Sequence, residues 1–320
     1  MRETGERRIF LSDAGDETAV YLGYSQVELD RAYAQREWAS NADAILARWN
    51  SRGAACRSAR YGYSEHAYGT GCDERIDLFE ADGDIVHFHL HGGAWRGQAK
   101  EDCSFMAPAM QDAGVTFVVP EFGRLPQTRM PVVLDQIVRA LVWTYEARIA
   151  TGRAEGIVVS GHSSGAHMAA LLASHDFRGR LPPGCLRAVL CVSGAYDLRP
   201  VMLSARRTYI DLAPAEVRQM SPILRTGDLH LPVHLMSGSD ESPEFCRQSR
   251  AYATSLGLAG RLAGCHELPG RNHFEIADDL GDPGSAAGQY VRALLSMPNR
   301  LSDLPPGTEA HPPLRSAAGR

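Results

Sequence analysis

The sequence lacks the marks of a membrane-spanning or nucleic-acid-binding protein. No window approaches the about 18 uninterrupted apolar residues that a membrane-spanning helix needs. The net charge is −5, the isoelectric point is near 6.2, and no stripe of Lys and Arg is present. We therefore expect no partner among membranes or nucleic acids, and we expect a small-molecule substrate. A homodimer is compatible with the sequence.

The cysteines also lack an ordered pattern. The seven of them show no C-x-x-C spacing, and their odd number in a long chain argues against a disulfide framework. Residues 1–8 mix charges of both signs and have no apolar core of signal-peptide length. We therefore expect a cytoplasmic protein.

The length and the periodicity predict one large α/β domain. The chain has 320 residues, of which 44% are hydrophobic, enough for a sizeable single core. Helical stretches alternate with strand-like runs at 85–91, 115–120, 156–160, 186–192, 232–237 and 261–268. This alternation is typical of a mostly parallel sheet with helices on both faces.

Three helices are predicted between and after these strands. The first opens at Pro131 and repeats apolar residues at Leu134, Val138, Leu141 and Tyr145. The second runs from Pro243 to about residue 256, and the third lies near 285–296.

A candidate nucleophile lies between the third strand and the helix that follows. The motif Gly161-His162-Ser163-Ser164-Gly165 has the form G-x-S-x-G. Glycine is needed at both ends because the turn is too tight for a side chain, and the serine is thereby exposed above the sheet. We therefore prefer a nucleophile at Ser163 to a chance Ser/Gly-rich turn.

An acid and a histidine follow the serine in the order that α/β-hydrolases use. The loop after strand 232–237 carries Asp240 and Glu241, and a Gly/Asn-rich loop carries His273. Glu241 lies three residues after Gly238 and is the expected acid, with Asp240 as the alternate. His273 is the expected general base.

A glycine-rich loop supplies a candidate oxyanion hole. Strand 85–90 ends in His91-Gly92-Gly93-Ala94-Trp95. The free N–H groups of Gly93 and Ala94, with that of Ser164, would bind a developing oxyanion. Such chemistry needs no cofactor.

Several histidines allow a second interpretation. His87, His89 and His91 alternate, so they share one face of a strand, as metal ligands sometimes do. Metal hydrolases of the H-x-H-x-D-H kind need an Asp-His pair next, and here Gly92-Gly93 follows. We therefore expect no metal, with these histidines in the core and His91 bracing the loop. His162 should point away from Ser163, and His167 should be structural.

The combined motifs resemble the arylformamidase (kynurenine formamidase) branch of the α/β-hydrolases, which borders the hormone-sensitive-lipase-like carboxylesterases. The resemblance spans residues 61–297, and further segments that carry it are 193–198, 241–249 and 272–274. It implies a serine hydrolase of tryptophan catabolism that removes a formyl group from an aryl amine. Two positions depart from the family pattern: Ser164 replaces an expected alanine, and Asp240-Glu241 replaces a single aspartate.

The resemblance also favours an aryl-binding pocket. Trp95, Tyr196 and Phe274 each closely follow one of the motifs and could line it, although core packing would explain each nearly as well. Arg124 and Arg271 lie in loops near the expected mouth and could meet a substrate carboxylate. Solvated loop arginines are the preferred interpretation.

The expected domains are a helical segment or cap at 1–60, the catalytic domain at 61–298 and a disordered Pro-rich tail at 299–320. In the related esterases a segment like the first covers the active-site mouth. Two alternatives to a formamidase remain: a carboxylesterase for short-chain aryl or alkyl esters, and a non-catalytic protein that binds small molecules.

Overall fold

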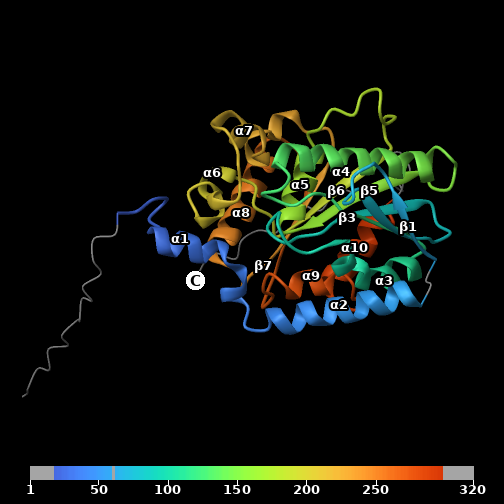
Figure 1. The fold of residues 1–320 in the computed structure, drawn as a ribbon, viewed down its shortest axis with the longest axis horizontal. Helices are drawn as coiled ribbons and strands as arrows, with labels where there is room; N and C mark the ends of the chain where they lie inside the picture. The colour runs from blue at the N-terminus through green and yellow to red at the C-terminus, as the bar shows by residue number, and fades with distance from the viewer. Residues whose placement is uncertain (1–17, 60–61, 298–320) are drawn as a thin grey trace, which may run out of the picture.

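A single eight-stranded sheet organises the protein. The computed structural model describes residues 18–59 and 62–297, and the sheet has the order β1-β2-β4-β3-β5-β6-β7-β8 (Figure 1). β2 runs antiparallel to both of its neighbours, and every later pairing is parallel. The strands are β1 (Tyr63–Ala67), β2 (Arg75–Phe79), β3 (Ile85–Leu90), β4 (Thr116–Pro120), β5 (Gly156–His162), β6 (Leu186–Val192), β7 (Val233–Gly238) and β8 (Leu262–Leu268).

Helices connect the strands and precede the sheet. They are α1 (Gln26–Tyr33), α2 (Ala42–Ser58), α3 (Ala107–Asp112), α4 (Met130–Thr144), α5 (Ser164–Leu172), α6 (Leu198–Val201), α7 (Pro214–Gln219), α8 (Pro243–Leu258), α9 (Glu275–Asp279) and α10 (Ala286–Leu295). Shorter turns are η1 (Gln35–Trp38), η2 (Lys100–Met106), η3 (Tyr145–Ile149), η4 (Ala205–Thr208), η5 (Pro222–Leu224) and η6 (Thr226–Asp228). Within this described part, no helix is long and apolar enough to cross a membrane.

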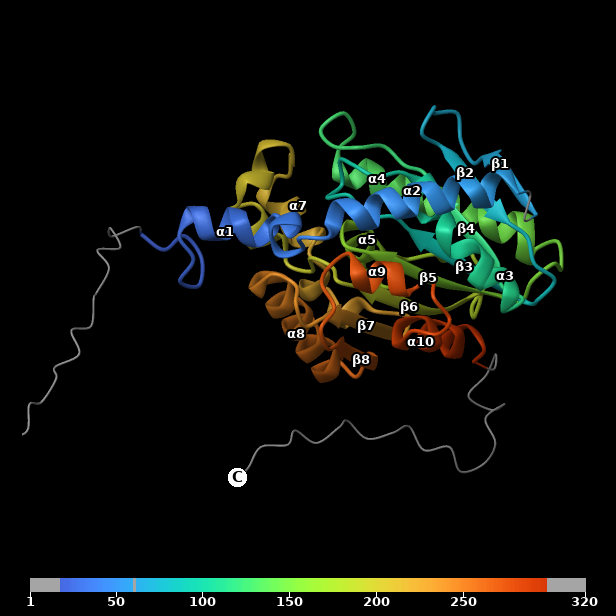
Figure 2. The same ribbon diagram turned by 90° about the horizontal axis from the view of Figure 1, so that it is seen from below.

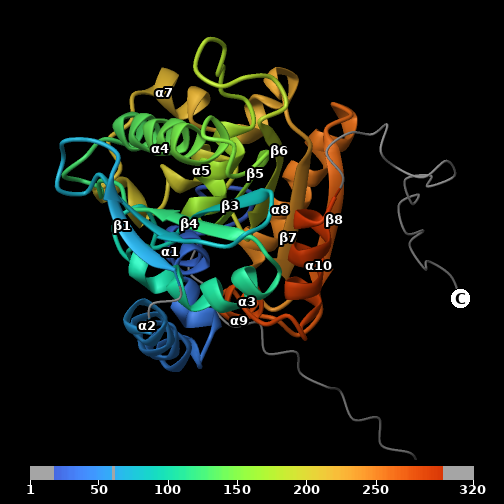
Figure 3. The same cartoon turned by 90° about the vertical axis from the view of Figure 1, so that its right-hand side faces the viewer.

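The helices cover both faces of the sheet, as predicted. One apolar core includes side chains of α4, α5 and α8, and a second includes side chains of α2, α3, α9 and α10. Figure 3 shows these two layers on opposite sides of the strands. The predicted architecture, a mostly parallel sheet with helices on both faces, is confirmed.

The six predicted strands are present, but the sequence analysis missed β1 and β2. β1 reads Tyr-Ser-Glu-His-Ala and is half-buried to exposed, so it has no apolar pattern. β2 carries a charged residue in its centre: Asp77 is fully buried. Its carboxylate accepts hydrogen bonds from Lys100 Nζ at 2.6 Å and from the Tyr63 hydroxyl at 3.2 Å. Buried charge needs such partners, and a single segment does not reveal them.

The helix predicted from Pro131 is α4, with its buried face turned slightly from the expected one. Val133, Ile137 and Leu141 are buried, while Leu134 and Tyr145 are only half-buried. The period of the pattern was right, but its contact with the sheet is centred one residue away.

The N-terminal helices lie against the domain that follows them. α1 begins with a capping box between Ser25 and Glu28, and Tyr33 at its end donates a hydrogen bond to Glu244 Oε1 of α8 at 3.1 Å. Figure 2 shows α2 lying across the sheet near α9, where Trp49 Nε1 donates to Asp278 at 2.8 Å. The expected tail at 299–320 lies outside the described residues, as do residues 1–17 of the expected N-terminal segment and the junction at 60–61.

Several histidines are buried in the core in the neutral form. Burial lowers the pKa of His87 to about 3 and that of His167 to about 4. His167 accepts a hydrogen bond from Trp95 Nε1 at Nδ1, and its Nε2 donates to the Met220 carbonyl. As expected, His167 is a structural residue.

These histidines should make the protein less stable in acid. The pKa of His167 rises from about 4 to the ordinary 6.5 when the chain unfolds, so unfolding takes up a proton between these pH values. The free energy of unfolding should therefore fall as the pH falls, by up to about 1.4 kcal/mol per pH unit for each such histidine. The free energy of unfolding can be measured by urea titration at several pH values from about 7 to about 5. In His167→Gln it should depend less steeply on pH, by the amount that corresponds to about one fewer proton taken up on unfolding.

His66→Gln is the matched control, because it replaces an exposed histidine of strand β1 and not one in the core. An unchanged slope in His167→Gln, or an equal change in His66→Gln, would contradict the assignment.

Candidate active site

The turn from β5 into α5 holds Ser163 in a backbone conformation that residues other than glycine rarely adopt. Its backbone has φ 57° and ψ −120°. A Cβ on Gly161 would collide with the Gly165 carbonyl group, and a Cβ on Gly165 would collide with the carbonyl oxygens of Leu90 and His91. Both glycines are therefore required by close backbone contacts, as the motif predicted.

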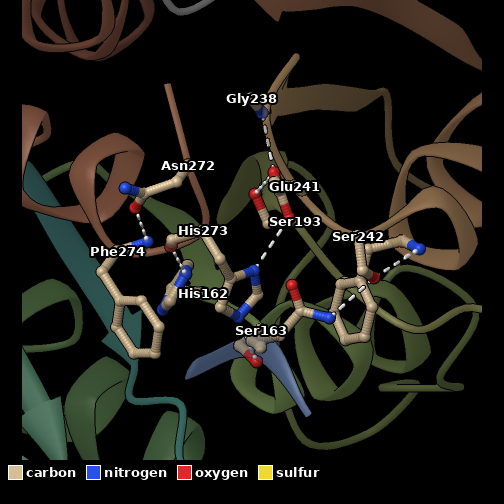
Figure 4. A network of polar contacts seen from close by, with 12 residues as sticks. His162, Ser163, Ser193, Gly238, Glu241, Ser242, Asn272, His273 and Phe274 are labelled. Atoms are coloured by element: carbon tan, nitrogen blue, oxygen red, sulfur yellow. Dashed lines mark hydrogen bonds and ion pairs between the residues drawn. The ribbon is translucent and has the colours of Figure 1, made fainter. Parts of the chain in front are cut away.

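Ser163, His273 and Glu241 form a hydrogen-bonded line, shown in Figure 4. Ser163 Oγ lies 2.9 Å from His273 Nε2, and His273 Nδ1 lies 2.8 Å from Glu241 Oε2. A carboxylate only accepts hydrogen bonds, so Nδ1 carries the proton and Nε2 accepts from the serine. All three side chains are buried.

Glu241 is fixed by its second oxygen. Oε1 accepts hydrogen bonds from Ser193 Oγ at 2.5 Å and from the Gly238 N–H at 2.7 Å. The neighbouring Asp240 is exposed, and its carboxylate accepts from Ser239 Oγ. The structure thus brings Glu241, and not Asp240, to His273.

Two contacts of this line were missed from sequence. Ser193 follows β6, and β6 lies between β5 and β7, whose ends carry Ser163 and Glu241; this order was the signal that could have found it. His162 donates from Nε2 to the His273 carbonyl at 2.8 Å. Burial, together with the nearby His273, lowers the pKa of His162 well below its ordinary value, so His162 stays neutral beside His273.

The loop after β3 lies directly beside the serine. A Cβ on Gly92 would lie 3.2 Å from the Ser163 Cβ, and Gly93 has φ +100°. Within residues 18–59 and 62–297, the N–H groups of Gly93, Ala94 and Ser164 donate no hydrogen bond to the protein. They are available to an oxygen atom of a ligand.

His91 braces this loop, as the sequence suggested. Its ring stacks on Phe122 at 4.2 Å between centroids, and its Nε2 lies 3.2 Å from Glu121 Oε1. His87 and His89 instead share a buried hydroxyl, Ser160 Oγ, at 2.6 and 2.7 Å. In the described part of the chain, no three His, Cys, Asp or Glu side chains are grouped to hold a metal ion.

A cavity of about 660 Å³ opens above Ser163 and His273. Three separate segments form most of its wall, and the lining residues are Asp30, Tyr33, Ala34, Gln35, Arg36, Leu46, Gly93, Ala94, Arg96, Gly97, Gln98, His162, Ser163, Ser204, Ala205, Arg206, Thr208, Tyr209, His273 and Phe274. The N-terminal helices therefore contribute to the mouth of the site.

The predicted aromatic wall needs correction at two positions. Phe274 lines the cavity, but Trp95 and Tyr196 do not. Trp95 is held in the core by its hydrogen bond to His167, and Tyr196 is buried in the core, where its hydroxyl accepts from the Gly194 N–H. Tyr33 and Tyr209 supply aromatic surface that the sequence analysis did not assign to the cavity.

Comparison with known proteins agrees with the sheet and the motifs. A family model described as the alpha/beta hydrolase fold matches residues 87–276, which is more than half of the chain. The chain belongs to the α/β-hydrolase fold family.

Relatives of this α/β-hydrolase include enzymes of two kinds. It is 28% identical to a kynurenine formamidase of Salmo salar over 231 residues, which cover 67% of this chain and 76% of the relative. It is 27% identical to the esterase LipQ of Mycobacterium tuberculosis over 244 residues, 67% of this chain and 58% of that protein. The predicted resemblance to kynurenine formamidases and esterases is confirmed, and the chain is a hydrolase.

A solved structure supports the same fold. A protein of Silicibacter sp. TM1040, described as a candidate thioesterase, matches with a TM-score of 0.73 at 24% identity. The match covers 84% of this chain and 99% of that chain.

The contact of Gly165 with β3 makes a direct prediction. Gly165→Ala should lower the free energy of unfolding of this α/β-hydrolase by about 1–3 kcal/mol, because the new methyl group must push α5 away from Leu90 and His91. Gly257→Ala in α8 is the control: nothing lies within 4 Å of its Cβ position, so that variant should be neutral or stabilised by up to about 1 kcal/mol. Thermal denaturation of both proteins would test this, and equal stability would refute the packing argument.

Proposed function

We propose that this α/β-hydrolase cleaves the formyl amide of an aryl amine, such as N-formylkynurenine, by nucleophilic catalysis at Ser163. The observation that carries the proposal is the continuous line from Ser163 Oγ through His273 to Glu241 at 2.9 and 2.8 Å, beside a cavity. A serine hydroxyl is a weak nucleophile until a neighbouring base takes its proton, and this line supplies that base.

The first step forms an acyl-enzyme. His273 Nε2 takes the Ser163 proton as Oγ attacks the carbonyl carbon, and Glu241 stabilises the resulting imidazolium. The N–H groups of Gly93, Ala94 and Ser164 bind the oxyanion of the tetrahedral intermediate. Each such donor typically contributes about 2.7–4 kcal/mol of transition-state stabilisation.

The first step ends when His273 gives its proton to the departing amine, which leaves Ser163 formylated. The second step releases the acyl group. Water then attacks the formyl ester with His273 again as base, and formate leaves. No step requires a cofactor.

The formamidase preference is supported by relatives and by the cavity. A kynurenine formamidase is among the similar proteins, and Phe274, Tyr33 and Tyr209 give the cavity flat apolar surface for an aryl group. A formyl carbon carries only hydrogen, so the binding energy must come from the amine.

A carboxylesterase for short-chain esters is the second candidate, and the similarity to the esterase LipQ favours it. The same residues would act on an ester carbonyl, with an alcohol leaving in place of the amine. A cytoplasmic location and a homodimer stay predictions from the sequence.

The two neighbouring acids give a clean test of the proposed triad. Glu241→Gln should lower kcat by about 10³–10⁴-fold, because the amide cannot stabilise the imidazolium and can favour the wrong tautomer. Asp240→Asn is the matched control, since Asp240 is exposed and bonded to Ser239, and it should change kcat little. A larger loss in Asp240→Asn would require the two roles to be exchanged.

A substrate panel tests the preference itself. We expect the wild-type protein to cleave N-formylkynurenine and aryl acetates, with kcat/KM falling as the acyl chain lengthens. Ser163→Ala should abolish both activities and labelling by a fluorophosphonate probe, which separates the enzyme from a contaminant. Preference for acyl chains of about six carbons over formyl and acetyl would overturn the formamidase proposal.

A further inference from the structure

Two arginines on the cavity wall have no acidic partner. Arg206 lies in η4, and Arg96 lies in the loop after the expected oxyanion hole; both line the cavity with Ser163. In the described part of the chain, neither forms an ion pair. By contrast, Arg36 on the same wall pairs with Asp43.

Arg124 and Arg271, which the sequence suggested as candidates to bind a carboxylate, each already form an ion pair with an acidic side chain. Arg124 lies 3.1 Å from Glu121 Oε2, and Arg271 lies 2.7 Å from Asp279 Oδ2. Neither of them lines the cavity. The unpaired positive charge is therefore at Arg206 and Arg96.

Aromatic rings hold these guanidinium groups in place. Arg206 Cζ lies 5.2 Å from the Tyr33 ring centroid and 5.6 Å from that of Trp95, and its Nη2 donates to the Tyr33 carbonyl at 2.6 Å. Arg96 Cζ lies 4.4 Å from the Tyr209 ring centroid. Stacking fixes the plane of a guanidinium group, which has five N–H donors, and leaves most of them free.

The two charges act on one another. Partial burial lowers the pKa of Arg206, and the positive charge of Arg96 lowers it further; a guanidinium group nevertheless stays charged in proteins. Asp30 is the single carboxylate among the described lining residues, and its Oδ1 already accepts from the Ala205 N–H at 2.5 Å and from Gln26 Nε2 at 3.0 Å. An anion near Arg206 and Arg96 would relieve their repulsion.

We infer that Arg206 and Arg96 bind a carboxylate of the substrate and thereby select leaving amines that carry one. The inference rests on the proposed function. A formyl group carries only hydrogen on its carbonyl carbon, so a carboxylate of the substrate must belong to the amine. Guanidinium groups recognise carboxylates by paired N–H donors, and fixed planes favour that geometry.

The kinetic test compares two substrates that differ only in this group: N-formylkynurenine and its decarboxylated analogue, N-formylkynurenamine. The wild-type protein should have a lower KM for N-formylkynurenine, which carries the carboxylate, than for N-formylkynurenamine. Arg206→Gln and Arg96→Gln should each raise the KM for N-formylkynurenine by about tenfold or more, with little change for the analogue. Arg207→Gln is the control: it removes the same charge from η4, but Arg207 does not line the cavity.

Direct binding separates this inference from the proposed function. Kynurenine and kynurenamine, the corresponding amines, can be titrated calorimetrically whether or not formyl amides are cleaved. Tighter binding of kynurenine to the wild-type protein, lost in Arg96→Gln, would support the carboxylate site even if the formamidase proposal failed. Equal affinities for the two amines would overturn it.

Arg96→Gln and a further variant, Arg206→Lys, guard against misfolding. Arg96 is exposed, so its replacement leaves the core packing unchanged. Arg206→Lys keeps the charge and should retain a preference for the carboxylate that Arg206→Gln loses. If Arg206→Lys and Arg206→Gln lose it equally while Arg96→Gln keeps it, the selection does not come from these charges.

Discussion

The close approach of α5 to the end of β3 is the constraint on which the site depends. Gly165 lies against the carbonyl oxygens of Leu90 and His91 with no room for a side chain. This contact fixes the first turn of α5 next to the loop that begins at Gly92, so the N–H of Ser164 and those of Gly93 and Ala94 can share one oxygen of a substrate. The same contact forces the sharp turn at Ser163, whose φ of 57° carries strain that the surrounding packed core sustains.

The order of the strands arranges the remaining groups around that turn. β6 and β7 follow β5 across the sheet, so residues just beyond their carboxyl ends stand in sequence beside Ser163. Ser193 after β6 also has a positive φ, 56°, and its hydroxyl meets the Glu241 carboxylate. A serine in this conformation and a backbone N–H from Gly238 together fix the acid, while the acid fixes the ring of His273. The precision of the line thus comes from backbone positions and not from the three side chains alone.

The sequence could predict features that are local and could not predict those that need a partner far along the chain. The turn at Ser163, the glycine loop and six strands each have a pattern within a few residues, and the parallel sheet follows from their alternation. β2 was missed because the Lys100 that neutralises Asp77 lies 23 residues further along the chain. Trp95 was expected in the pocket because it follows a motif, but its indole N–H has a buried acceptor in His167. Arg206 had no local signal, since its surroundings come from Tyr33, Trp95 and Phe245.

The cavity wall separates the chemistry from the choice of substrate. The groups that would act on a carbonyl lie at the ends of β3, β5, β7 and β8. The arginines without an acidic partner and the two lining tyrosines instead belong to α1, to η4 with the residue that follows it, and to the loop beyond Ala94. Changes in the second set can alter charge and shape above Ser163 without moving the hydrogen-bonded line. Relatives that are formamidases and relatives that are esterases are therefore compatible with one catalytic arrangement. On the wall of this cavity, no acidic side chain of residues 18–59 and 62–297 pairs with Arg206 or Arg96, and a substrate carboxylate would supply the missing negative charge.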